Sequence, residues 1–173
     1  MKLKKYIKLL TEVGDLSNID PYEYNIRGLS TEFDTGIDKI LVSFKKIDNF
    51  NGEVIGPPIL YKDKESLVGY NIEYSINGED TQYRKSDYSY LIKILKTVTN
   101  IIIDTILKND LSNENIQNVY CIGSISKTGM ISNDKQKDMM YREIAKNQLP
   151  TSYRILEIEF AEIGITGIAI TKK

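Results

Sequence analysis

The basic side chains that are the best candidates for binding chemistry lie between residues 127 and 150. Lys127 follows VYCIGSIS, and Lys137 and Arg142 lie in DKQKDMMYREIAKNQLP. Lysine and arginine bind phosphate oxygens through charge-assisted hydrogen bonds, so these three residues are candidate contacts for an anion or for nucleic acid. A charged back on a core-packing helix explains most of this segment. This explanation does not account for Lys137, which lies one turn before Tyr141 on the apolar side of the helix.

Two pairs of carboxylates have spacings that catalysis or metal binding can use. Glu157 and Glu159 in LEIEF would share one strand face, where they could hold a metal ion; a solvent-exposed polar face explains the same pattern. Asp34 and Asp38 flank Gly36 in FDTGIDK, and DTG suggests an aspartic protease, whose two carboxylates share a proton. The chain has one copy of this triplet, so such a protease would require a dimer.

The composition excludes several common chemistries. The chain has no histidine, so it lacks the usual proton shuttle, the Ser-His and Cys-His pairs and nearly all ligand sets of zinc hydrolases. The glycines of GSISKTGM do not have the spacing of a phosphate-binding loop. We therefore predict a non-enzymatic protein without a metal or cofactor.

The charge balance also limits the partners. Acidic residues number 24 and basic residues 23, so a contact with nucleic acid would have to be local, for instance through Tyr83, Arg84 and Lys85. The longest apolar run, in TVTNIIIDTIL, is interrupted by Asn100 and Asp104 and is shorter than the roughly 20 residues of a membrane helix. No membrane partner is predicted. The 12 tyrosines supply the amphipathic contact area that is enriched at protein interfaces.

The first 30 residues predict a short amphipathic helix and a linker. In MKLKKYIKLLTE, apolar residues recur at i, i+3, i+4 and i+7, the spacing of one helix face. This helix either docks on the rest of the chain or is a targeting or partner-binding segment. The polar stretch GDLSNIDPYEYNIRGLSTE is interrupted by Gly14, Pro21 and Gly28, so it is predicted to connect rather than to pack. Residues 31–173 are predicted to form one domain.

Hydrophobic periodicity predicts the elements of that domain. Alternation predicts strands in IDKILVSFKKI and SLVGYNIEYSI, the second of which leads through Asn77-Gly78 into a return strand near DTQYRKS. A long buried helix capped by Ser86 or Asp87 follows, then an interior strand, VYCIGSIS, with Cys121 buried. Residues 134–150 are predicted as a second helix, and YRILEIEF and IGITGIAI as a terminal hairpin. The predicted fold class is α+β, with a mainly antiparallel sheet and two packed helices on one face, plus the short amphipathic amino-terminal helix.

Two short motifs follow each other after the long helix. VYCIGSISK ends in Ser126 and Lys127, and KDMMYREI has Lys137 four residues before Tyr141, with Ile144 shortly after. This order, after a sheet and a long helix, resembles a group of uncharacterised small proteins of tailed bacteriophages, and the resemblance spans residues 68–160 in outline. Relatives tend to have more arginine around the tyrosine, where this chain has Met139 and Glu143.

The amino-terminal segment carries a further resemblance. MKLKKYIKLLTE is similar to the Lys-rich leaders of phage proteins delivered into a prohead, which a protease cuts after tripeptides such as Leu10-Thr11-Glu12. Together the resemblances imply a non-enzymatic phage protein, a minor virion component or an accessory factor, located in the virion or the host cytoplasm. Its expected partners are other phage proteins, and an oligomer is compatible with this role. Local binding of nucleic acid or phosphate through Lys127, Lys137 and Arg142 is the alternative function.

Overall fold

Six strands and one helix make up the part of the chain that the computed structural model describes, which is residues 19–48, 66–78, 84, 87–112, 115–125, 149–160 and 165–173. In chain order the elements are β1 (Ser30–Asp34), β2 (Lys39–Lys46), β3 (Ser66–Ile76), α2 (Tyr88–Ser112), β4 (Ile116–Ile125), β5 (Tyr153–Phe160) and β6 (Ile165–Lys172).

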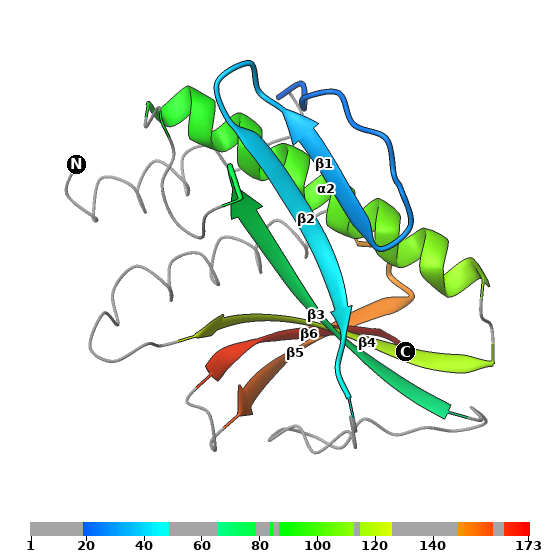
Figure 1. Ribbon diagram of the computed structural model, residues 1–173. Coiled ribbons are helices and arrows are strands. Elements are labelled where there is room, and N and C mark those ends of the chain that lie inside the picture. Colours follow the sequence, from blue (N-terminus) through cyan, green and yellow to red (C-terminus); the bar gives the residue numbers. More distant parts are fainter. Residues whose placement is uncertain are drawn as a thin grey trace.

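The strands form one mixed sheet in the order β1-β2-β3-β4-β6-β5 (Figure 1). β3 and β4 pair in parallel, starting with Ser66 beside Ile116, and the other neighbouring strands pair antiparallel. The lengths explain the parallel pair. The 11 residues of β3 span about 36 Å, and the 25 residues of α2 rise about 38 Å. The helix therefore returns the chain to the end of the sheet at which β3 began.

The predicted fold class is wrong in two respects. The sheet is mixed, because α2 is a crossover between parallel neighbours, whereas the prediction was a mainly antiparallel sheet. The described residues contain one helix on the sheet, not two packed helices with an amino-terminal helix besides. The segments predicted as those further helices, in residues 1–12 and 134–150, lie outside the described ranges except for their last two residues, Leu149 and Pro150, which are not helical.

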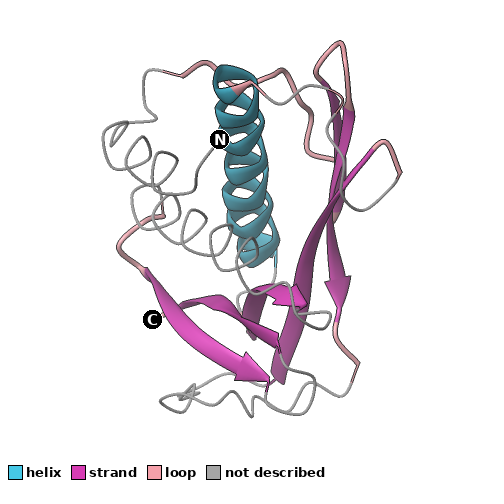
Figure 2. Ribbon diagram, turned by 90° about the vertical axis from the view of Figure 1, so that its left-hand side faces the viewer, coloured by secondary structure: helices cyan, strands magenta, loops and turns pink. Residues whose placement is uncertain are grey.

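The main core lies between α2 and one face of the sheet (Figure 2). Isoleucine and valine at helical spacing on α2 meet alternate residues of β2, β3 and β6, and burial of such side chains is the main stabilising term of a fold. The fully buried residues of this core include Ile94, Val98, Ile101, Ile106, Ile40, Val42, Ile168 and Ile170. The sequence prediction of a largely buried central helix is confirmed.

The segment before β1 packs, although its polar composition predicted a connecting linker. Tyr22 stacks on Phe33 with ring centroids 5.9 Å apart, and its backbone N–H donates to Thr97 Oγ1 at 2.9 Å. Tyr24 donates its hydroxyl to Asp104 at 2.7 Å. Residues 19–29 thus lie along α2, and β1 begins directly after them.

The other predicted elements have mixed outcomes. The strands at β2, β3 and β4 and the antiparallel hairpin of β5 and β6 are confirmed, as is the cap of α2, where Asp87 accepts the backbone N–H of Tyr90 at 3.1 Å. The return strand after Gly78 has one described residue, Arg84, which lies in a bend. Asn77 does have the positive φ of a turn, 53°, but its backbone N–H bonds Lys39 of β2.

Candidate functional site

The predicted cationic site lies outside the described residues. Lys127, Lys137 and Arg142 all belong to the range 126–148 that the structure does not describe, so their role as anion or nucleic-acid contacts remains a prediction. The backbones of Glu157 and Glu159 lie on β5, but their side chains are not described, and metal binding by this pair is untested.

The DTG triplet forms the hairpin turn between β1 and β2. The exposed Asp34 accepts the backbone N–H of Gly36 at 2.7 Å, and Gly36 has a φ of 82°, a conformation that costs glycine little. Thr35 Oγ1 accepts the backbone N–H of Asp38 at 2.8 Å. The hairpin turn is therefore enough to explain the DTG triplet in this chain.

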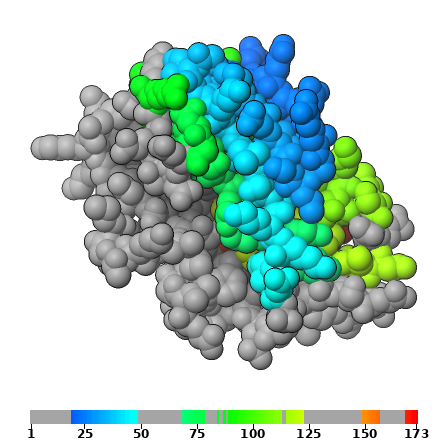
Figure 3. Space-filling view, in the orientation of Figure 1, coloured from blue at the N-terminus to red at the C-terminus, as the bar shows by residue number. Residues whose placement is uncertain are grey.

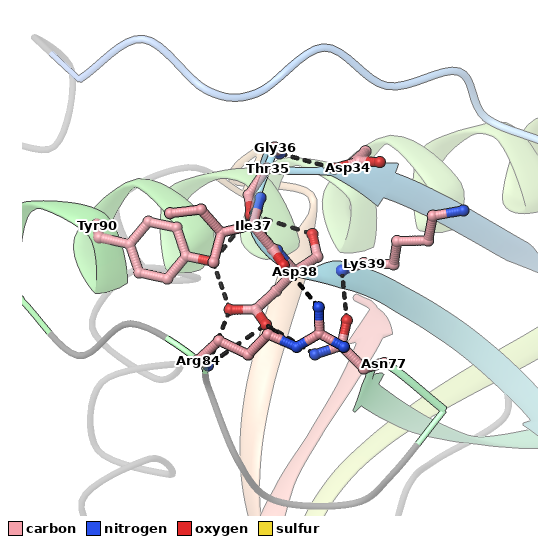
Figure 4. A network of polar contacts seen from close by, with 9 residues as sticks. All are labelled: Asp34, Thr35, Gly36, Ile37, Asp38, Lys39, Asn77, Arg84 and Tyr90. Atoms are coloured by element: carbon pink, nitrogen blue, oxygen red, sulfur yellow. Dashed lines mark hydrogen bonds and ion pairs between the residues drawn. The ribbon is translucent and has the colours of Figure 1, made fainter.

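Asp38 lies at the centre of a polar cluster that joins four parts of the fold (Figure 4). Its carboxylate accepts the hydroxyl of Tyr90 at 2.5 Å, the side-chain amide of Asn77 at 2.7 Å and the backbone N–H of Arg84 at 3.2 Å. Thr35 lies 2.8 Å from the same Tyr90 hydroxyl. The cluster ties the β1–β2 turn to the end of β3, to Arg84 and to the first turn of α2.

The surroundings of Asp38 favour its ionised form. Desolvation of the buried carboxyl raises its pKa, but hydrogen bonds from Tyr90, Asn77 and Arg84, together with the Arg84 charge, lower the pKa below its ordinary value of 3.8. Burial and the neighbouring carboxylate raise the pKa of Tyr90 to about 12. The Asp38 side chain is 0% exposed, so in this conformation it fixes the hairpin rather than meeting a ligand.

A second buried carboxylate, Asp110, joins the end of α2 to the other half of the sheet. It accepts the hydroxyls of Tyr120 and Tyr153, each at 2.6 Å, and the side-chain amide of Asn118 at 2.7 Å. Burial, followed by these bonds to Asp110, raises the pKa of both tyrosines above its ordinary value. The sequence analysis did not single out Asp110. The signal was its place four residues after Ile106 on the buried stripe of α2.

An open groove runs along β1 at the surface of the described residues. It has a volume of about 950 Å³ and is lined by residues 21–25 and Arg27 of the preceding segment and by Ser30, residues 32–34 and Leu41. Tyr22 and Tyr24 hold the preceding segment on α2, as described above, so that wall of the groove is anchored. Residues 19–48 lie at the surface on this side of the molecule (Figure 3).

The floor of this groove includes a strand edge that is open in the described part of the chain. β1 is the first strand in the sheet order, and no described strand pairs with its outer side. The C=O of Leu29 accepts the N–H of Phe44 at 2.8 Å, and the N–H of Thr35 donates to the C=O of Asp38 at 2.9 Å. Because these bonds alternate along a strand, the N–H and C=O groups of Glu32 and Asp34 face away from β2. The outward N–H of Ser30 already donates to the C=O of Arg27 at 3.4 Å. We call the outward backbone groups of Glu32 and Asp34 the β1 edge.

The described residues show no alternative site of metal or membrane type. They contain no group of three or more His, Cys, Asp or Glu side chains that could hold a metal ion. Within the same ranges, no helix has the length and apolarity to cross a membrane. Cys121 is buried, which raises the pKa of its thiol to about 12 and opposes formation of a reactive thiolate.

Comparison with known proteins adds no relative. No protein-family model matches the chain, and no curated protein or solved structure shows significant similarity to it.

Proposed function

We propose that the chain is a non-enzymatic bacteriophage protein, a minor virion component or an accessory factor, that binds other phage proteins through the β1 edge. The observation that carries the binding role is the outer side of β1, with which no described strand pairs, inside an open groove. An open strand edge can hydrogen-bond an added strand, and proteins normally cover, shorten or charge such edges. The phage origin is supported by the sequence resemblance, as are the locations considered, the virion and the host cytoplasm.

The anchoring of the groove supports a role in partner recognition. One wall is anchored, because the preceding segment is held on α2 by a hydrogen bond from Tyr22 to Thr97 and by one from Tyr24 to Asp104. The ammonium group of Lys93 lies 4.4 Å from the centre of the Tyr22 ring and adds a cation–π contact to this wall. A prearranged groove lowers the entropic cost of ordering a partner.

The second function, local binding of nucleic acid or phosphate, depends on Lys127, Lys137 and Arg142. No described residue supports it. The test of the proposed function must therefore also be able to detect binding of nucleic acid or phosphate.

The test is site-specific photo-crosslinking in infected cells and in purified particles, followed by mass spectrometry. A photoreactive amino acid replaces Glu32 in the β1 edge, and the matched control replaces Asp48, an exposed acidic residue beyond the other end of β2. We expect position 32 to crosslink to a defined segment of an identified phage protein, and position 48 not to do so. Quantification of the chain in particles and in lysate then separates a virion component from an accessory factor.

Two results would overturn the proposal. Crosslinks to a phage protein that are equal from both positions would show that the β1 edge is not the contact. Retention of the unmodified chain on DNA or RNA that weakens steeply with salt, with no protein crosslink, would favour the second function.

A further inference from the structure

The groove around the β1 edge carries an excess of negative charge. Its charged lining residues are Glu23, Glu32, Asp34 and Arg27, all of them exposed. Lys39 lies beside Asp34 in the register of β1 and β2 and offsets that carboxylate. Glu23 and Glu32 form no ion pair with another described residue. Within the described residues, the three carboxylates of the lining outnumber its one guanidinium group, which disfavours phosphate groups and favours cations.

The side chains of β1 alternate between two environments. Ser30, Glu32 and Asp34 are exposed, whereas Thr31 and Phe33 are buried on the core side. Residues directly opposite each other in paired strands place their side chains on the same face. A strand added to the β1 edge would thus place alternate side chains beside Glu32 and Asp34, and the intervening ones on the side of the half-buried Tyr22 ring, which stacks on Phe33.

We propose that the partner is an extended protein segment in which lysine or arginine alternates with apolar residues, and that it joins the sheet as a strand beside β1. This inference rests on the proposed function and names the class of its partner. The cationic positions face Glu32, and the apolar positions face the aromatic side of the groove. A second copy of β1 is a poor occupant, because self-pairing would bring the carboxylates of two acidic edges together.

The length of the exposed edge sets the size of the probe. β1 has five residues, so a strand that covers it and extends one or two residues beyond each end needs about eight residues. We would therefore measure binding of the full chain to a synthetic peptide of about this length that alternates lysine with valine. Two matched peptides serve as controls: one alternates glutamate with valine, and one has the lysine-valine sequence with N-methyl groups on alternate amides. The N-methyl peptide keeps the charge and loses the strand hydrogen bonds.

The protein side of the experiment uses charge reversals at exposed positions. Glu32→Lys changes the β1 edge, and Asp48→Lys makes the same change in net charge outside the groove. We expect the lysine-valine peptide to bind the native chain, and both N-methylation and Glu32→Lys to weaken that binding by about tenfold or more. Asp48→Lys should leave the affinity within about twofold, and the glutamate-valine peptide should not bind.

Three results would overturn the inference. They are no binding of the lysine-valine peptide, equal binding of its N-methylated form, and equal binding of the glutamate-valine peptide. Equal binding of the N-methylated form would indicate charge attraction without strand pairing. The proposed function can survive this failure: if position 32 still crosslinks to an identified phage protein, the β1 edge binds a partner of different chemistry. If position 32 also gives no specific crosslink, both proposals fail.

Discussion

Replacement of Asp38 by alanine should be one of the most destabilising single changes in the described part of the chain. The carboxylate is buried and accepts hydrogen bonds from Tyr90 at 2.5 Å, from Asn77 at 2.7 Å and, at the longer distance of 3.2 Å, from the backbone N–H of Arg84. A hydrogen bond to a charged group contributes about 1.5–3 kcal/mol, so the loss of the two shorter bonds alone predicts a destabilisation of about 3–6 kcal/mol.

The assay is equilibrium unfolding by urea, with Asp34→Ala as the matched control in the same hairpin. Asp34 is exposed and makes one local hydrogen bond to Gly36, so its replacement should change the free energy of unfolding by less than about 1 kcal/mol. For a chain of this length, the Asp38→Ala loss corresponds to a fall in Tm of about 10 °C or more. A double-mutant cycle with Tyr90→Phe should show coupling, because the two residues share one hydrogen bond.

The pH dependence gives an independent check of the same cluster. The pKa of Asp38 is lower in the folded chain than its ordinary value of 3.8, so the unfolded chain takes up this proton first as the pH falls. The stabilisation by Asp38 is therefore complete above about pH 4 to 5 and is lost as the pH falls through the folded-state pKa. Asp38→Ala should flatten this part of the stability curve. The reasoning is refuted if Asp38→Ala and Asp34→Ala unfold at the same urea concentration, or if both keep the acid dependence of the native chain.

Three further predictions follow from the buried polar groups. Tyr153→Phe removes the hydroxyl that donates to Asp110 at 2.6 Å, and should lower the free energy of unfolding by about 1.5–3 kcal/mol in urea titrations; a loss below about 0.5 kcal/mol would contradict the role of this cluster. The folded chain holds the Tyr90 proton more tightly than the unfolded chain, so the contribution of Tyr90 to stability should fall as the pH rises from 10 through about 12. In an alkaline titration, the tyrosinate absorbance of Tyr90 should therefore appear later than that of exposed tyrosines and together with unfolding. Cys121 is 2% exposed, so a thiol reagent should label it only as fast as the chain opens, and labelling at the rate of a free thiol would show that the strand is accessible.

The sequence predicts local elements well where periodicity is unbroken. The stripe of α2 and the alternation in β2 and β3 identify both the elements and their buried faces. The sequence does not predict the pairing of distant strands, because alternation shows which face of a strand is buried but not which neighbouring strand it meets. The parallel contact of β3 and β4 follows from the matching lengths of β3 and α2, which become evident only once the boundaries of both are known.

The sequence analysis did not predict strand β1, and the reason is again that pairing between strands decides whether it forms. Its five residues, STEFD, contain two apolar-side positions, Thr31 and Phe33, and such a short alternation is hidden among the glycine and proline signals of the preceding segment. β1 exists because Val42 and Ile40 of β2 pair with those two residues, so tertiary pairing decides the outcome.

The two buried carboxylates show how far sequence reasoning about a site could have gone. Asp38 continues the alternation of Ile40 and Val42, and Asp110 continues the helical stripe through Ile106, so both could have been predicted as buried charges. Three of their donors could not, because Tyr90, Asn77 and Tyr153 lie 39 to 52 residues away from the carboxylate that they bond.

Amide hydrogen exchange of the full chain, measured alone and bound to the phage protein identified by crosslinking, tests the central claim most directly. A strand added to β1 would bond the outward N–H groups of Glu32 and Asp34, so we predict that exchange at these two amides slows by about tenfold or more in the complex. Amides on the outer face of α2 and in β4 should change little. Unchanged exchange at Glu32 and Asp34, with protection at another surface of the chain, would contradict the assignment of the β1 edge as the binding site.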